Sequence, residues 1–319
     1  MTQSLRTLLA GLIDYAGLFP PAKLEMGPAT EAFARHLRGE HEFGLGRFIC
    51  PVSRLEEFSR AAAALMPGTF ATSGYREYAE STRAWSVSAI LDWPLPDAFE
   101  QSLDAIDAFN AHHAEEANGL ARIDTIELKV TRPSAIDEAL DELPDDLFPF
   151  FEFDLAQDCR GYVAALAGNA ESGGAGAKLR CGGVKPELIP APEHVADALC
   201  ALVAADVPFK ATAGLHHPWR AVQSLTYEAS APRAVMHGFV NVFLGAALAR
   251  AHRLDRGALL RVLTEEDPRA FVFTEDRASW RELSIDTASL AKVRETFALS
   301  YGSCSFDEPF ADLAASGLV

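Results

Sequence analysis

The sequence has few cysteines and few basic residues, and both shortages exclude classes of protein. Its five cysteines are an odd number with no C-x-x-C pair, so we expect neither a disulfide framework nor a zinc cluster. Reduced thiols are typical of a cytoplasmic protein, which is the location we expect. The 28 Lys and Arg residues are outnumbered by 45 Asp and Glu residues, which gives a formal net charge of −17. Such a chain repels nucleic acid and anionic membrane surfaces, so neither is expected as a partner.

Long hydrophobic runs, linkers and nucleotide-binding motifs are also missing. The apolar start of the chain is broken by Asp14 and by the prolines at 20 and 21, so it predicts neither a signal peptide nor a membrane span. No low-complexity stretch separates two domains, and no segment matches a P-loop or a dinucleotide fingerprint. The hydrophobic content of 49% is ample for a large core. We therefore expect residues 1–319 to form a single catalytic domain.

Short β-rich apolar runs alternate with segments whose apolar residues recur every three or four positions, as in amphipathic helices. This alternation implies right-handed βαβ units and a parallel sheet. Six such units, with material for about two more, predict an α/β fold of the (β/α)8 TIM-barrel type. The strands are expected at 47–52, 85–92, 125–130, 148–155, 177–183 and 207–214, and the helices at 55–66, 97–113, 134–143, 156–170 and 191–205.

The C-terminal third is less regular. Residues 238–252 fit either a seventh strand that runs into its helix or one long buried helix. Residues 270–276 are a plausible eighth strand, residues 287–299 predict a helix, and the tail at 301–309 is rich in turn residues. The sequence leaves open which segments form the last two strands.

Charged residues interrupt four consecutive predicted strands in the same way. The central strands of a parallel barrel are normally apolar throughout, because both faces are covered. Side chains two positions apart share a face, and the C-terminal end of a barrel is where catalytic residues lie. We therefore expect one polar cavity at that end, lined by Glu127 and Lys129, Glu152 and Asp154, Lys178 and Arg180, and Lys210 with Thr212.

The segment KATAGL (210–215) resembles the K-[TS]-[ST]-[TA]-G-[FL] strand motif of the deoxyribose-phosphate aldolase group. In that family the motif lysine lies on the sixth barrel strand and forms a Schiff base with the substrate carbonyl. Lys210 lies on the sixth of the predicted strands, so the resemblance implies that it forms the imine. Lys178 and Arg180 are then the neighbouring cations that lower its pKa.

Two histidines follow the same strand. His216 and His217 lie in a loop that would cap the barrel mouth. A histidine there can act as an acid or base near neutral pH, and we take His216 as the catalytic candidate and His217 as a substrate-binding one.

Two glycine-rich turns, RCGGVK (180–185) and GSCSF (302–306), could hold an anion through backbone amides. They add Gly182, Gly183 and Ser303 to the substrate-binding candidates. Cys181 and Cys304 flank these turns, and because no histidine is close to either in sequence, we expect both to be packing residues.

These residues together predict an aldolase-like lyase acting on a small, anionic carbonyl compound, without a cofactor. Glu152 or Asp154 would move protons, while Arg180, Glu127, Lys129 and Thr212 would bind substrate. One alternative is a metal-dependent lyase or isomerase that holds a divalent ion with Glu127, Glu152, Asp154 and His216. Another is a non-catalytic protein that only binds a small ligand. The only partner expected is a small-molecule substrate, and a homo-oligomer stays open.

Overall fold

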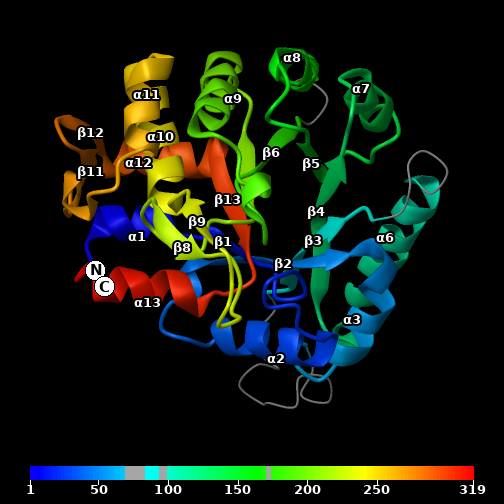
Figure 1. The fold of residues 1–319 in the computed structure, drawn as a ribbon. Coiled ribbons are helices and arrows are strands. Elements are labelled where there is room, and N and C mark those ends of the chain that lie inside the picture. The colour runs from blue at the N-terminus through cyan, green and yellow to red at the C-terminus, as the bar shows by residue number, and fades with distance from the viewer. Residues whose placement is uncertain (69–82, 93–98, 170–173) are drawn as a thin grey trace.

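Eight parallel strands close into a barrel at the centre of the structure, a computed structural model that describes residues 1–68, 83–92, 99–169 and 174–319 (Figure 1). The predicted (β/α)8 TIM-barrel fold is therefore confirmed. In order around the barrel, the strands are β1 (Ile13–Tyr15), β2 (Leu45–Pro51), β3 (Trp85–Ile90), β4 (Ala121–Lys129), β5 (Phe148–Glu152), β6 (Gly176–Arg180), β7 (Phe209–Thr212) and β13 (Ala298–Ser303).

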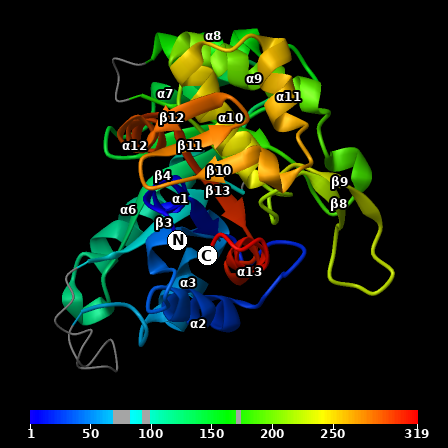
Figure 2. The same cartoon turned by 90° about the vertical axis from the view of Figure 1, so that its left-hand side faces the viewer.

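The barrel closes through two strands that the sequence did not reveal. β1 has only three residues and contains a charged one, Asp14, while β13 ends inside the tail that was expected to form turns. These two strands pair in parallel, with Ile13 opposite Tyr301, which brings the two ends of the chain close together in Figures 1 and 2. All six predicted strands are present. Because β1 precedes them, Lys210 lies on the seventh barrel strand and not on the sixth.

Helices cover the outside of the barrel. All five predicted inter-strand helices and the predicted helix at 287–299 are present, with ends that differ by a few residues; positions 97, 98 and 170 lie outside the described residues. The helices are α1 (Gln3–Leu9), α2 (Met26–His36), α3 (Leu55–Ala62), α6 (Phe99–His113), α7 (Ser134–Leu140), α8 (Arg160–Gly168), α9 (Pro192–Ala205), α10 (Phe239–His252), α11 (Arg256–Leu263), α12 (Thr287–Thr296) and α13 (Asp307–Ala315).

The connection from β7 to β13 carries most of the irregular C-terminal third. Residues 238–252 form the long buried helix α10, which was one of the two expected alternatives. The expected strand at 270–276 is β10 (Phe271–Phe273), which lies outside the barrel. β10 pairs in antiparallel fashion with β11 (Arg277–Trp280), and β11 pairs with β12 (Leu283–Asp286). A hairpin of β8 (Ala221–Ser224) and β9 (Arg233–Met236) projects from the body of the molecule (Figure 2).

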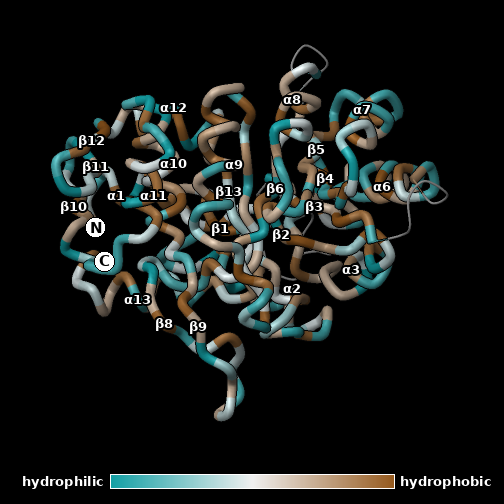
Figure 3. Tube along the Cα trace, turned by 45° about the horizontal axis from the view of Figure 1, so that its top comes forward, coloured by the Kyte–Doolittle hydropathy of each residue, from teal (hydrophilic) through white to brown (hydrophobic). Residues whose placement is uncertain are grey.

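The apolar core lies between the barrel and its helices, and Figure 3 shows hydrophobic and hydrophilic residues alternating along the surrounding helices. Among the described residues, one helical stretch, Pro186–Ala205, is long and apolar enough to cross a membrane by length and composition alone. Its main part, α9, contacts α8, α10 and α11, and it buries Val195, Leu199 and Leu202 against the core. This stretch therefore packs as one of the barrel helices.

Candidate active site

A cavity of about 410 Å³ opens at the C-terminal ends of the barrel strands. It is lined by residues from the ends of β4, β5, β6 and β7 and by the loops that follow β1, β3, β6, β7 and β13. Catalytic sites of this fold lie at that end, since the loops there vary without disturbing the barrel. The charged side chains of the cavity wall are Glu127, Lys129, Glu152, Lys178, Arg180 and His216.

Four of the ionisable residues form one row across β4 to β7. Lys129 is in register with Glu152, Glu152 with Lys178, and Lys178 with Lys210. Glu127 lies two residues before Lys129 on β4 and reaches both Lys178 and Lys210. Glu127 and Lys210, which are 83 positions apart in sequence, thus come within hydrogen-bond distance in the barrel.

Lys178 is the lysine at the floor of the cavity. Its Nζ forms ion pairs with Oε2 of Glu127 at 2.8 Å and with Oε2 of Glu152 at 2.9 Å, and only 6% of its side chain is exposed. Burial alone would lower the pKa of this amine, but the two carboxylates outweigh burial and raise the pKa above 10.5. Lys178 is therefore an ammonium ion at neutral pH.

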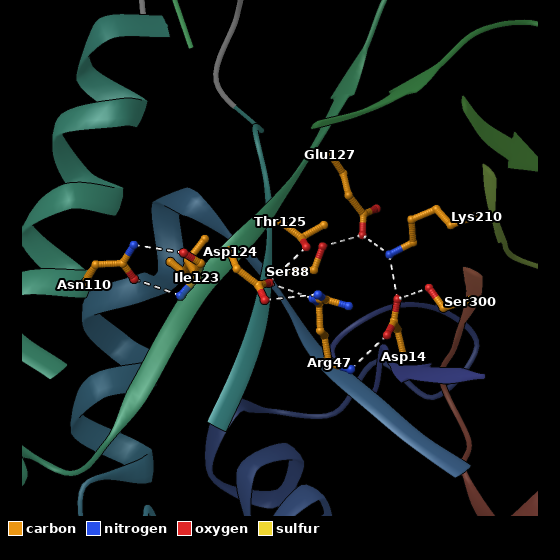
Figure 4. A network of polar contacts seen from close by, with 10 residues as sticks. All are labelled: Asp14, Arg47, Ser88, Asn110, Ile123, Asp124, Thr125, Glu127, Lys210 and Ser300. Atoms are coloured by element: carbon orange, nitrogen blue, oxygen red, sulfur yellow. Dashed lines mark hydrogen bonds and ion pairs between the residues drawn. The ribbon is translucent and has the colours of Figure 1, made fainter. Parts of the chain in front are cut away.

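Lys210 is not among the residues that line the cavity. It is fully buried, and its Nζ donates hydrogen bonds to Oδ2 of Asp14 at 2.7 Å and to Oε1 of Glu127 at 2.6 Å (Figure 4). Lys178 and Lys210 thus contact different oxygens of one carboxylate. A cation this deep in the protein is tolerated because two carboxylates compensate its charge.

Asp14 is the site residue that the sequence analysis missed. Besides Lys210, it accepts hydrogen bonds from the Arg47 backbone N–H at 2.8 Å and from the Ser300 hydroxyl at 2.7 Å (Figure 4). A Cβ at Gly46 would lie 2.3 Å from Oδ1 of Asp14, so only glycine permits this approach. The signal was present in the sequence as a single charge inside an apolar run, but the three-residue strand around it was too short to recognise.

The buried carboxylates are held in their ionised form. Burial would raise the pKa of Glu127, but Lys178 and Lys210 together bring it far below 4.5. Ser88 also donates a hydrogen bond to Oε1 of Glu127 at 2.7 Å. The pKa of Glu152 is lowered in the same way, because Lys178 and Arg180 outweigh its burial.

Two further cations lie at the rim of the cavity. Arg180 contacts Oε1 of Glu152 through Nε at 2.8 Å, and 44% of its side chain is exposed. Lys129 is exposed and, within the described ranges, has no carboxylate partner.

The site therefore combines four cations, Lys129, Lys178, Arg180 and Lys210, with three carboxylates, Asp14, Glu127 and Glu152. This local excess of positive charge occurs in a chain of net charge −17 and favours an anionic ligand.

His216 lies in the cavity wall, with Nδ1 3.2 Å from Oε2 of Glu308. Burial would lower the pKa of its imidazole, but neighbouring Cys304 and Glu308 raise it to about 9. Cys304 also lines the cavity, which corrects the expectation that it only packs. Thr212 and Gly183 line the cavity as well.

Four other candidates do not line the cavity. β5 ends at Glu152, so the alternation does not continue to Asp154, which instead binds the N–H of Ala156 in the following loop. His217 contacts Asp312 on α13. Gly182 packs against Gly214, where a Cβ would come within 2.7 Å of the Cα, so its glycine is required by the close approach of two loops. The Ser303 hydroxyl donates to the carbonyl of Ser305.

The metal alternative has no assembled ligand set in the described part of the chain, where no three His, Cys, Asp or Glu residues are arranged to hold an ion. Of its four candidate ligands, Glu127 and Glu152 are bound to cations, His216 is paired with Glu308, and Asp154 lies outside the cavity.

The chain matches no protein-family model, no curated protein and no solved structure.

Proposed function

We propose that this barrel is an aldolase-like lyase that acts on a small, anionic carbonyl compound through a lysine imine. The observation that carries the proposal is the position of Lys178, an amine at the cavity floor within 2.9 Å of two carboxylates and next to the rim cation Arg180. The rim cations would bind the anionic group of the substrate, and the carboxylates would accept and return protons.

The geometry favours Lys178 over Lys210 as the imine-forming amine. The resemblance of KATAGL to the aldolase motif pointed to Lys210, but the cavity wall includes Lys178 and not Lys210. Lys210 would then act through Glu127, by holding that carboxylate in place and ionised. Lys178 on β6 would then form the imine that the motif implies for Lys210 on β7.

The proposed reaction begins when the Lys178 ammonium loses a proton to solvent, with Glu152 or Glu127 relaying it. The neutral amine adds to the carbonyl carbon. The carbonyl oxygen takes one proton from the amine nitrogen and one from solvent through the same carboxylate, and it leaves as water. The product is an iminium ion that carries the same single positive charge as the ammonium it replaces, so the buried network keeps its charge balance. Electrons from the breaking C–C bond then flow into the iminium to give an enamine, while the hydroxyl on the departing carbon gives its proton to a carboxylate and that fragment leaves as a carbonyl compound. The carboxyl group then protonates the enamine carbon, and water hydrolyses the resulting iminium to release the second product and Lys178.

A second candidate function follows from the ion pairs of Lys178 with Glu127 and Glu152, which favour its charged form. A lysine that stays an ammonium ion can stabilise an enolate electrostatically without forming an imine, as in proton transfer next to a carbonyl group. The two candidates share the cavity and the substrate class, and they differ in whether a covalent bond forms.

Intact-protein mass after borohydride reduction tests the proposal. Glyoxylate and pyruvate serve as small anionic carbonyl probes, with acetaldehyde and acetone as neutral controls. We expect each anionic compound to add one reduced adduct to the protein. The concentration of compound needed for this labelling should be lower for the anionic compounds than for the neutral controls. Absence of any adduct, together with catalysed proton exchange next to the pyruvate carbonyl, would replace the imine with the second candidate.

A further inference from the structure

A second group of polar side chains includes two residues of the same cavity wall, His216 and Cys304, and has no part in the lysine chemistry. Cys304 follows β13, His216 follows β7, and Tyr227 lies in the loop of the β8–β9 hairpin. His216 and Cys304 are 88 positions apart in sequence. They meet because β7 and β13 are neighbours in the barrel, and both line the cavity.

Two groups that can donate hydrogen bonds lie next to the Cys304 sulfur. Its Sγ lies 4.0 Å from Nδ1 of His216 and 3.6 Å from the Tyr227 hydroxyl. Oε2 of Glu308 lies 3.2 Å from Nδ1 of His216 and 3.5 Å from the Tyr227 oxygen. A carboxylate beside an imidazole favours the charged imidazolium, and an imidazolium beside a thiol favours the thiolate.

The other four cysteines provide an internal comparison. Burial raises the pKa of Cys159 and Cys200, raises that of Cys181 to about 12, and raises that of Cys50 further still. Burial acts on Cys304 in the same direction, but His216, Tyr227 and Ala22 outweigh it and lower the pKa below 9.0. Cys304 thus differs from the other thiols through its neighbours and not through its exposure.

We propose that Cys304 is a nucleophilic thiolate of the cavity that adds to the carbonyl carbon of a small aldehyde bound there. A carbon–sulfur bond forms, the π electrons of the carbonyl move to its oxygen, and that oxygen takes a proton from His216. The product is a thiohemiacetal, and nothing is oxidised or reduced. This inference rests on the proposed function in one respect, the expectation that the aldehyde carries an anionic group. The assignment of Cys304 as the nucleophile depends only on the contacts of Cys304 itself.

Alkylation rates test whether Cys304 is the reactive thiol. The folded protein is treated with limiting iodoacetamide near neutral pH, and each cysteine is followed by peptide mass spectrometry. Cys304 is expected to react at least about tenfold faster than the more exposed Cys200, because reactivity follows the thiolate fraction. Tyr227→Phe and His216→Asn should slow Cys304, while His217→Asn, which alters the adjacent histidine outside the cavity, should not. Equal rates at Cys304 and Cys200 would overturn the proposal.

Carbon-13 NMR tests the adduct itself. Glyoxylate labelled at the aldehyde carbon should give a protein-bound sp³ carbon signal that is absent from Cys304→Ser. Lys178→Arg keeps the cation but cannot form an imine, so in this variant the signal should persist. A bound signal that survives Cys304→Ser and disappears in Lys178→Arg would place the aldehyde on the lysine and contradict the thiolate role, while leaving the proposed function intact. If no bound signal appears although Cys304 alkylates rapidly, the thiol is reactive but does not add to aldehydes, and the proposal is also wrong.

Discussion

Lys178 lies directly opposite Lys210 in the register of β6 and β7, and the two ammonium groups contact different oxygens of the same carboxylate, that of Glu127. Two neighbouring cations would normally repel each other in a buried site. Here Asp14 also pairs with Lys210 and Glu152 also pairs with Lys178, so positive and negative groups alternate across the site. Removing any one member should therefore change the properties of all the others.

Glu127→Gln should destabilise the fold strongly. The substitution leaves two buried ammonium groups with one carboxylate each, and breaking a buried ion pair on one side costs about 3–5 kcal/mol. Urea unfolding at neutral pH measures this loss. Glu138→Gln removes a surface partner of Arg132 and should leave the free energy of unfolding nearly unchanged. Equal effects of the two variants would show that the buried network contributes no more to the free energy of unfolding than a surface ion pair does.

Stability should also fall in acid. The pKa values of Glu127 and Glu152 lie below 4.5 in the folded protein, so these groups contribute stability that is present above pH 4.5 and is lost as the pH falls through their folded-state values. Lys178, with its pKa above 10.5, contributes stability that is present below pH 10.5 and is lost at higher pH. Unfolding free energies across this range should form a plateau with a drop on the acid side, and Glu127→Gln should reduce that drop. An unchanged acid dependence in the variant would contradict the assignment.

Turnover should rise with pH if the neutral amine of Lys178 reacts. Its pKa lies above 10.5, so the neutral fraction grows about tenfold for each pH unit in the neutral range. Glu152→Gln removes one of the carboxylates that raise this pKa and should shift the profile to lower pH. Initial rates between about pH 6 and 8 measure both effects. A flat profile in the wild type would favour the electrostatic role of a permanent ammonium ion.

The rim cation Arg180 should control affinity for anionic substrates. Arg180→Met removes a charge-assisted contact and should raise KM about 10- to 100-fold for an anionic carbonyl compound, with less effect on a neutral one. Arg256 is a matched control, because it is similarly exposed, pairs with Asp197 and lies outside the cavity wall. Equal changes in the Arg180 and Arg256 variants would remove Arg180 from the binding site.

The sequence was sufficient to predict the barrel and a polar cavity at the C-terminal ends of its strands. The i, i+2 spacing of Glu127 and Lys129, and of Lys178 and Arg180, indicated a polar cavity, because side chains two apart share a face of a strand. The sequence could not reveal the partners of each lysine. Lys178 and Lys210 are in register, but Lys210 binds Asp14 and Glu127 and is not among the residues that line the cavity. Asp14 lies in a three-residue strand without a periodic signal, and Cys304 meets His216 only because the barrel closes.

Peptide mapping of the borohydride-trapped protein is the most direct test of the central claim. The wild type is reduced in the presence of an anionic carbonyl probe, and the modified residue is located by mass spectrometry, with Lys178→Arg and Lys210→Arg treated in parallel. We expect the adduct to lie on Lys178, to disappear in Lys178→Arg and to be retained, at a lower level, in Lys210→Arg. An adduct on Lys210, or its retention in Lys178→Arg, would contradict the account and return the imine to the lysine of the KATAGL motif.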